Sequence, residues 1–79
     1  MASSDIEIPP SGLVDAELAS RIAGVKPGTI RVWKNRGHLD YARDIDGQPF
    51  RDREGRLLFE ADDVIEVEYK LRQRARRAA

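Results

Sequence analysis

The sequence contains no cysteine, a single histidine and no long apolar run. The lack of cysteine excludes a disulfide, a thiolate metal site and a cysteine nucleophile, and His38 alone cannot build a histidine zinc site. No stretch has the length and apolarity of a membrane span, and the first eleven residues lack the pattern of a secretory signal. With 79 residues, of which 41% are hydrophobic, the chain can form one small domain with a compact core. We expect a cytoplasmic protein without metal or cofactor.

Charged residues cancel in number but not in position. Fourteen basic and fourteen acidic residues give a net charge of zero. Residues 26–38 nevertheless carry four basic residues and no acid, residues 57–69 carry five acids and no base, and residues 70–79 carry five basic residues. A nucleic-acid ligand responds to the clustering of charge on one face rather than to the net charge. The two basic segments are therefore compatible with binding to a nucleic acid, although the net charge is zero.

The first third of the chain predicts a leader followed by two short helices. Residues 1–12 are rich in serine, proline and glycine, which indicates a flexible leader before a domain at residues 13–79. Apolar residues at helical spacing predict a helix over residues 16–23, with Asp15 as its cap and Gly24 as its stop. Pro27 is suited to open a second helix, which runs to about Arg36 and ends before Gly37.

The rest of the chain predicts a hairpin and a third helix. Residues 38–59 have no helical period; Asp46-Gly47 and Glu54-Gly55 mark two turns, and residues 49–53 are expected to pair with residues 56–59. No internal repeat is expected. Glu60 is expected to open the longest helix, stabilised by i,i+4 ion pairs from Glu66 and Glu68. Its core-facing stripe comprises Ala61, Val64, Val67, Leu71 and Ala75.

A basic second helix that follows a glycine-containing turn is the arrangement that places a helix in the major groove of DNA. At 100° per residue, Ile30 and Trp33 share one side and face the core. The opposite side presents Arg31, which can reach guanine, Asn35, which can pair with adenine, and Val32, which can meet a thymine methyl. We predict base contacts from Gly28, Thr29, Arg31, Val32 and Asn35, and backbone contacts from Lys26, Lys34 and Arg36.

The order of motifs resembles a known family. The motifs are Glu17-Leu18-Ala19 with Ile22-Ala23-Gly24-Val25, then Thr29-Ile30-Arg31-Val32-Trp33, Gly37-His38-Leu39, a hairpin, and Phe59-Glu60-Ala61-Asp62-Asp63-Val64. Together they are similar to the MerR-type winged helix-turn-helix, in the minimal form of phage and plasmid excisionases and small effector-free regulators. The resemblance implies a mostly α fold with a β-hairpin wing around residues 46–56. It also implies a bacterial or phage origin and no effector module. Wing contacts with the DNA backbone are then expected from Arg51, Arg53 and Arg56.

Two apolar residues fall outside the core stripe of the third helix. Ile65 stands where the family has a polar residue, and Tyr69 follows one turn later. Both are predicted to contact another protein, with packing under the wing as the open alternative. The basic run of residues 70–77 either complements the helix dipole or contacts DNA.

The leading hypothesis is sequence-specific binding of double-stranded DNA, as an excisionase-like architectural factor or a small transcription regulator. The alternative is a phage DNA-packaging or adaptor module, similar to a small terminase subunit, that works through protein contacts. Catalysis is not expected, because the sequence holds no nucleophile–base pair, metal set or phosphate-binding loop. The expected partners are double-stranded DNA, a recombinase or integrase, and further copies of the chain head to tail on DNA. Neither a membrane nor a small molecule is expected as a partner.

Overall fold

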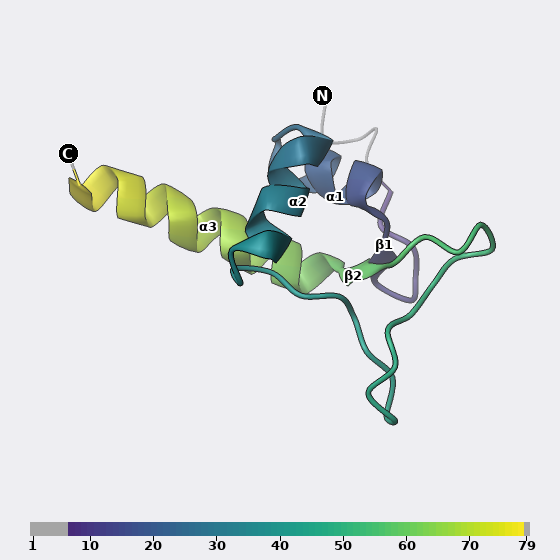
Figure 1. Ribbon diagram of the computed structural model, residues 1–79. Coiled ribbons are helices and arrows are strands. Elements are labelled where there is room, and N and C mark those ends of the chain that lie inside the picture. The colour runs from purple at the N-terminus through teal and green to yellow at the C-terminus, as the bar shows by residue number, and fades with distance from the viewer. Residues whose placement is uncertain (1–6, 79) are drawn as a thin grey trace.

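The structure is a computed structural model that describes residues 7–78 of the chain and the side chains of residues 7–75. In chain order its elements are β1 (Leu13–Val14), α1 (Ala16–Ala23), α2 (Pro27–Asn35), β2 (Phe59–Glu60) and α3 (Ala61–Ala78) (Figure 1). The protein is mostly α with a small antiparallel sheet, as the sequence predicts in outline. The first six residues of the predicted leader lie outside the described part of the chain.

The two short helices begin and end where the sequence predicts. The Oδ1 atom of Asp15 accepts a hydrogen bond of 2.8 Å from the backbone N–H of Leu18, which caps α1. Gly24 ends α1 at a φ of 72°, a left-handed conformation that suits glycine. Lys26 precedes α2 without a side-chain cap, and Pro27 supplies its first residue.

The two strands join the start of the folded domain to the segment just before α3. Strand β1 pairs antiparallel with β2, so that Leu13 lies opposite Glu60 and Val14 opposite Phe59. The backbone N–H of Ala61 also donates to the carbonyl of Gly12 at 2.8 Å. The prediction that Glu60 opens the third helix is wrong by one residue, because its backbone belongs to this ladder. Residues 12–14 therefore pair with the chain just before α3. This pairing was not predicted, because it joins residues that are distant in the sequence.

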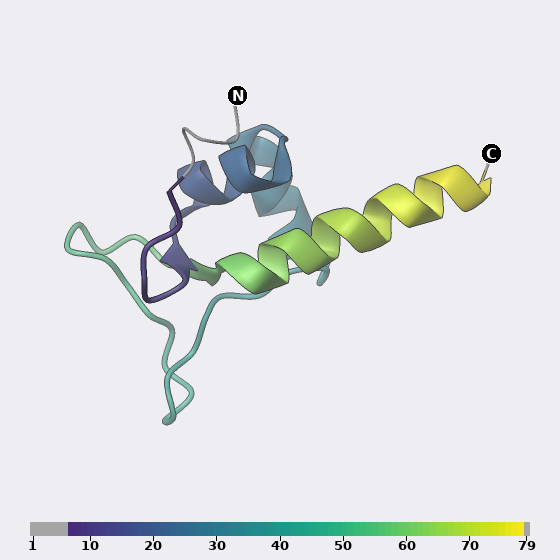
Figure 2. The same cartoon turned by 180° about the vertical axis from the view of Figure 1, so that it is seen from behind.

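The core lies between α1, α2 and the first half of α3. Its buried side chains are Val14, Ala19, Ile30, Trp33, Leu39, Phe59, Ala61 and Val64. The predicted core positions of α2, Ile30 and Trp33, are thus confirmed, as is the first half of the α3 stripe. Ala75 is exposed, contrary to its place on that stripe, because α3 runs on past the other elements (Figures 1 and 2).

Residues 42–58 form two consecutive turns rather than one hairpin. We call residues 43–48 the first turn and residues 51–56 the second turn. Both have glycine at a φ of 83°, at Gly47 and Gly55, as the predicted turn centres require. Bridges join Arg43 to Pro49 and Arg51 to Leu57. The second bridge falls within the predicted pairing of residues 49–53 with residues 56–59, while the first was not predicted.

The two turns leave from a closed ring of backbone hydrogen bonds. Ala42 N–H donates to the carbonyl of Leu58 at 2.9 Å, Phe50 N–H to that of Ala42 at 2.9 Å, and Leu58 N–H to that of Phe50 at 3.0 Å. The three residues are eight positions apart. Each extended segment is thereby held by the other two, and the turns diverge from the ring in different directions (Figure 1).

Candidate nucleic-acid interface

Helices α1 and α2 are joined by a turn of three residues that contains Gly24. Val25 N–H donates to the carbonyl of Ser20 at 2.9 Å, which holds the chain in a tight bend at the end of α1. Both helices contribute buried residues to the same core, Ala19 from α1 and Ile30 from α2. Because α2 buries Ile30 and Trp33 together, its opposite side faces outward.

The residues predicted to contact bases lie mainly on this outward side. Arg31 and Asn35 are exposed, and Val32 keeps 42% of its surface accessible. Gly28 is exposed as well, and a Cβ atom built on it would have no neighbour within 4 Å. Thr29 is half-buried, which leaves it at the edge of this surface. The outward face therefore offers a guanidinium, an amide, an aliphatic group and bare backbone within nine residues.

Among the described residues, the basic side chains on and around α2 form no ion pair with an acidic side chain. The segment from Lys26 to Arg36 contains four basic residues and no acid. Within the described chain, no ion pair involves any of them, and Lys34 Nζ instead lies 4.8 Å from the centre of the Tyr41 ring. Their positive charge is therefore available to a ligand. We call this surface, made of Lys26, Gly28, Thr29, Arg31, Val32, Lys34, Asn35 and Arg36, the α2 face.

Most other basic side chains that the structure describes are engaged within the molecule. Arg21 pairs with Glu17 at 3.8 Å and Arg43 with Asp40 at 3.6 Å. On α3 the two predicted i,i+4 pairs are confirmed: Lys70 lies 3.7 Å from Glu66, and Arg72 lies 3.3 Å from Glu68. Among the side chains that the structure describes, four of the six basic residues without an ion pair or hydrogen bond therefore lie on the α2 face, and the other two are Arg53 and Arg74.

The three arginines predicted to act from the wing differ in their surroundings. Arg56 contacts three carboxylates, those of Asp15 at 3.6 Å, Asp52 at 3.3 Å and Glu54 at 3.3 Å. It thus ties the second turn to the start of α1. Arg51 donates from Nη1 to the carbonyl of Gly55 at 2.8 Å, across its own turn. Only Arg53, exposed at the tip of the second turn, has no hydrogen bond or ion pair among the described residues.

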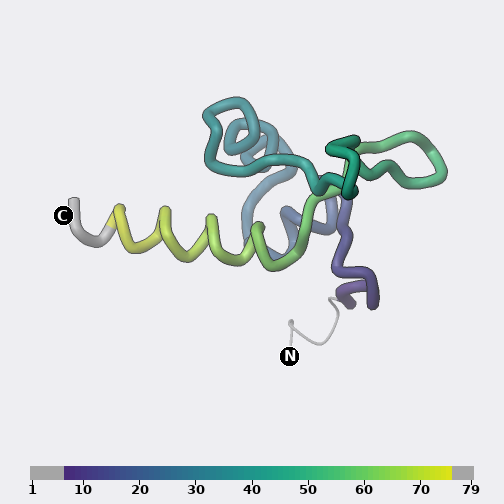
Figure 3. The backbone as a smooth tube through the Cα atoms, turned by 90° about the horizontal axis from the view of Figure 1, so that it is seen from below, coloured from purple at the N-terminus to yellow at the C-terminus, as the bar shows by residue number. Residues whose placement is uncertain are grey.

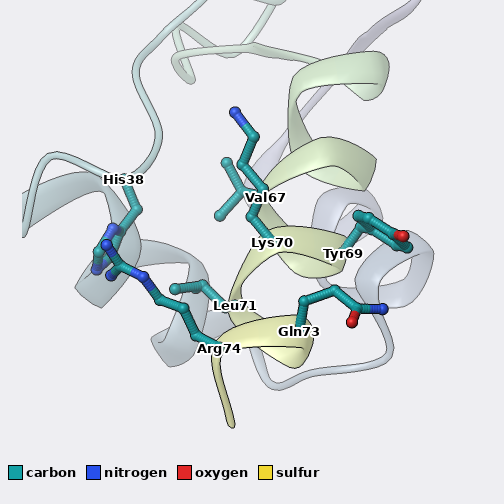
Figure 4. A pocket seen from close by; sticks show the side chains of 7 residues that line it. All are labelled: His38, Val67, Tyr69, Lys70, Leu71, Gln73 and Arg74. Carbon is teal, nitrogen blue, oxygen red and sulfur yellow. The ribbon is translucent and has the colours of Figure 1, made fainter. Parts of the chain in front are cut away.

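The residues predicted to contact protein are exposed on α3. Ile65 is 46% exposed and Tyr69 is 54% exposed, and the Arg72 guanidinium lies 5.8 Å from the centre of the Tyr69 ring. Beside them a groove of about 460 Å³ opens between α3 and the loop after α2 (Figure 4). Val67 and Leu71 form its half-buried apolar wall, and His38 and Arg74 lie at one end of it.

Among the carboxyl groups that the structure describes, that of Asp40 has a displaced pKa. The backbone N–H of Tyr41 donates to Asp40 Oδ1 at 2.7 Å, and this hydrogen bond, aided by the positive charges of Arg43 and Lys34, lowers the pKa of Asp40 below its ordinary value. Burial opposes the effect only in part. Asp40 therefore stays ionised at the edge of the α2 face, where it sits near Lys34.

Two kinds of feature are not found in the part of the chain that was described. None of its helices has both the length and the apolarity to cross a bilayer. No group of three or more histidine or acidic side chains among residues 7–75 is arranged to hold a metal ion. Comparison of the chain with protein-family models, curated proteins and solved structures finds no match.

The two turns repeat one sequence pattern, so the expectation of no internal repeat is wrong. Residues 43–48 read RDIDGQ and residues 51–56 read RDREGR, so both follow the pattern Arg-Asp-X-acid-Gly. The signal was a period of only eight residues, shorter than the repeats that build solenoids or propellers. In the structure each copy of the pattern forms the same turn.

Proposed function

We propose that this protein binds double-stranded DNA with the α2 face in the major groove, as an excisionase-like architectural factor or a small transcription regulator. The observation that supports this most is the charge of the α2 face: four basic residues, none with an acidic partner in the described chain. Phosphate neutralisation by such residues supplies much of the affinity for DNA.

The dimensions and chemistry of α2 suit this role. With its side chains an α-helix is about 10–12 Å across, which fits a major groove about 12 Å wide, and the nine residues of α2 make it about 14 Å long. Arg31 would donate to the O6 and N7 atoms of guanine, and Asn35 would pair with adenine. The bare backbone at Gly28 allows the first turn of the helix to approach the bases closely.

Flanking residues would set the position of the helix along the DNA. Lys26 and Arg36 stand just before and just after α2, where they can reach phosphates on either side of the groove. Arg53 is the second-turn residue with a free guanidinium, so we assign it the contact with the neighbouring backbone. The interactions of Arg51 and Arg56 within the second turn support its shape.

The proposal is tested by selecting duplexes from a random library and measuring the affinity of the preferred site by fluorescence anisotropy. Arg31→Ala should lose about 1–3 kcal/mol on that site, because a bidentate base contact is removed. Arg72→Ala makes the same change of charge on α3, where Arg72 is paired with Glu68, and should retain the affinity. Equal affinity of Arg31→Ala and the parent protein would exclude α2 as the reading helix.

The dependence of binding on salt separates this proposal from the packaging or adaptor module. If Lys26, Lys34, Arg36 and Arg53 meet phosphates, the logarithm of affinity should fall with the logarithm of salt at a slope of about −3 to −4. Lys34→Ala should reduce that slope by about one and weaken all duplexes alike. The packaging or adaptor module would work mainly through protein contacts, which the exposed side chains of Ile65 and Tyr69 favour. The DNA affinity of such a protein would change little with salt.

A further inference from the structure

The two turns share one backbone design and differ at their tips. In the first turn Asp44 Oδ1 accepts from the backbone N–H groups of Asp46 and Gln48, both at 2.9 Å. In the second turn Asp52 Oδ1 accepts from the equivalent N–H groups at 3.0 and 2.8 Å. Each turn is also closed by an arginine Nη1 that donates to the glycine carbonyl, at 3.0 Å in the first and 2.8 Å in the second.

Because the scaffold is repeated, the residue at the tip is not required for the turn itself. Ile45 occupies the tip of the first turn, and Arg53 occupies the same position in the second. Ile45 is fully exposed, with a relative exposure of 101%. The hydrogen bonds of the turn hold the backbone that carries Ile45, so little backbone freedom remains to be lost when the tip meets a partner.

The tips also carry opposite charge. The first turn, residues 43–48, contains one basic and two acidic residues, whereas the second, residues 51–56, contains three basic and two acidic residues. Asp46 stands beside Ile45, and within the described residues no ion pair involves its carboxylate. The first turn is therefore an apolar tip with a negative flank, which is unfavourable for contact with DNA phosphates and suitable for a positively charged partner surface.

Such a surface exists on the same molecule. The groove beside α3 combines the apolar wall of Val67 and Leu71 with positive groups at its edges, Lys70 and Arg74 (Figure 4). Lys70 shares its charge with Glu66, while Arg74 has no ion pair among the described residues. The first turn, with Asp46 next to Ile45, is therefore complementary to this groove, in which Arg74 lies beside the apolar wall.

Tip and groove cannot meet within one molecule. In Figures 1 and 2 the first turn projects downward from the body of the fold, whereas α3 extends sideways from it, so the tip of the first turn points away from the groove of its own molecule. A contact between them must therefore join two molecules, and it leaves a free tip at one end of the pair and a free groove at the other.

We propose that the Ile45 tip of one copy inserts into the groove of a second copy, against Val67 and Leu71, with Asp46 facing Arg74. The contact is small compared with the interface of a stable complex, so it forms at millimolar concentration or when the copies are held close together. It does not depend on the α2 face and does not require that the protein bind DNA. The second turn has the opposite tip charge and is excluded from the groove.

Cysteine cross-linking tests this contact directly, because the native chain has no cysteine. One preparation carries Ile45→Cys and the other Gln73→Cys, at the edge of the groove. The two are mixed at millimolar concentration, oxidised, and the disulfide-linked species are identified by intact mass. The matched control replaces Ile45→Cys by Arg53→Cys, at the same position of the second turn.

We expect the mixed dimer of Ile45→Cys with Gln73→Cys to exceed the control mixture severalfold. In the cysteine-free protein, the amide resonances of Val67 and Leu71 should shift with concentration, and Ile45→Ser should abolish this shift whereas Arg53→Ser should retain it. Equal yields in both mixtures, or groove resonances that do not change with concentration, would overturn the proposal. A loss of single-site DNA affinity in Ile45→Ser would also overturn it, because the tip would then contact DNA.

Discussion

Replacement of Gly28 by alanine should raise the stability of the protein and lower its affinity for DNA. Gly28 is the second residue of α2, and its backbone is not in the left-handed region. A methyl group at this position would meet no atom within 4 Å in the free protein. The substitution therefore creates no clash in the folded state. Because glycine loses more conformational freedom than alanine when it enters a helix, alanine also lowers the conformational entropy of the unfolded chain, which favours folding.

The expected gain is about 0.4–1 kcal/mol in the free energy of unfolding. For a domain of this size, 1 kcal/mol corresponds to about 4–8 °C in the melting temperature, so we expect a rise of about 2–8 °C. Gly24→Ala is the matched control, since its added methyl group also meets nothing within 4 Å. Gly24 has a φ of 72°, however, and alanine there should lower stability by about 1–2 kcal/mol.

The effect on DNA binding should have the opposite sign at Gly28. If the first turn of α2 approaches the bases, the added methyl group occupies space that the groove needs, and we expect a loss of about 1 kcal/mol or more on the preferred site. Thermal melts followed by circular dichroism and anisotropy titrations measure the two effects separately. A higher melting temperature with unchanged affinity would refute the close approach at Gly28, and a lower melting temperature would refute the conformational argument.

Three further predictions concern stability and pH. Trp33→Ala should lose about 3–5 kcal/mol, most of what so small a domain holds, because the indole is only 8% exposed; denaturation followed by circular dichroism checks it. Asp15→Ala should lose about 0.5–2 kcal/mol through the missing cap on Leu18, visible as a lower denaturation midpoint. Asp40 should titrate by NMR below the ordinary value of about 3.9. Because its folded-state pKa is lowered, its contribution to stability is present above that value and is lost as pH falls through the folded-state pKa. A titration of Asp40 at or above the ordinary value would contradict the role of the Tyr41 hydrogen bond.

Local chemistry was enough to predict the two short helices and the turn between them. The cap at Asp15, the stop at Gly24 and the start at Pro27 all act on backbone groups within four residues, so a reading of neighbours in the sequence finds them. The burial of Ile30 and Trp33 follows from helical spacing in the same way. The residues of the α2 face were likewise identified from the period of a helix. The structure adds that the basic ones among them have no acidic partner in the described chain.

The third helix shows where helical period stops being informative. The stripe from Ala61 to Ala75 is continuous in the sequence, yet only its first half is covered by the fold. Periodicity says which side of a helix is apolar but not how far the rest of the protein extends along it. Whether Ala75 is buried depends on the lengths of α1 and α2, which end well before the end of α3 (Figure 3).

Features made by distant residues were decided by the tertiary structure alone. The pairing of Val14 with Phe59 and the ring formed by Ala42, Phe50 and Leu58 join segments through hydrogen bonds whose partners no local pattern specifies. The same holds for the ion pair of Arg56 with Asp15, which links the second turn to the start of α1. Helices and turns are determined within a few residues, so the sequence by itself predicts them. Strand pairing, charge compensation and the exposure of Ile45 depend on which distant segments meet, and only the folded chain brings those segments together.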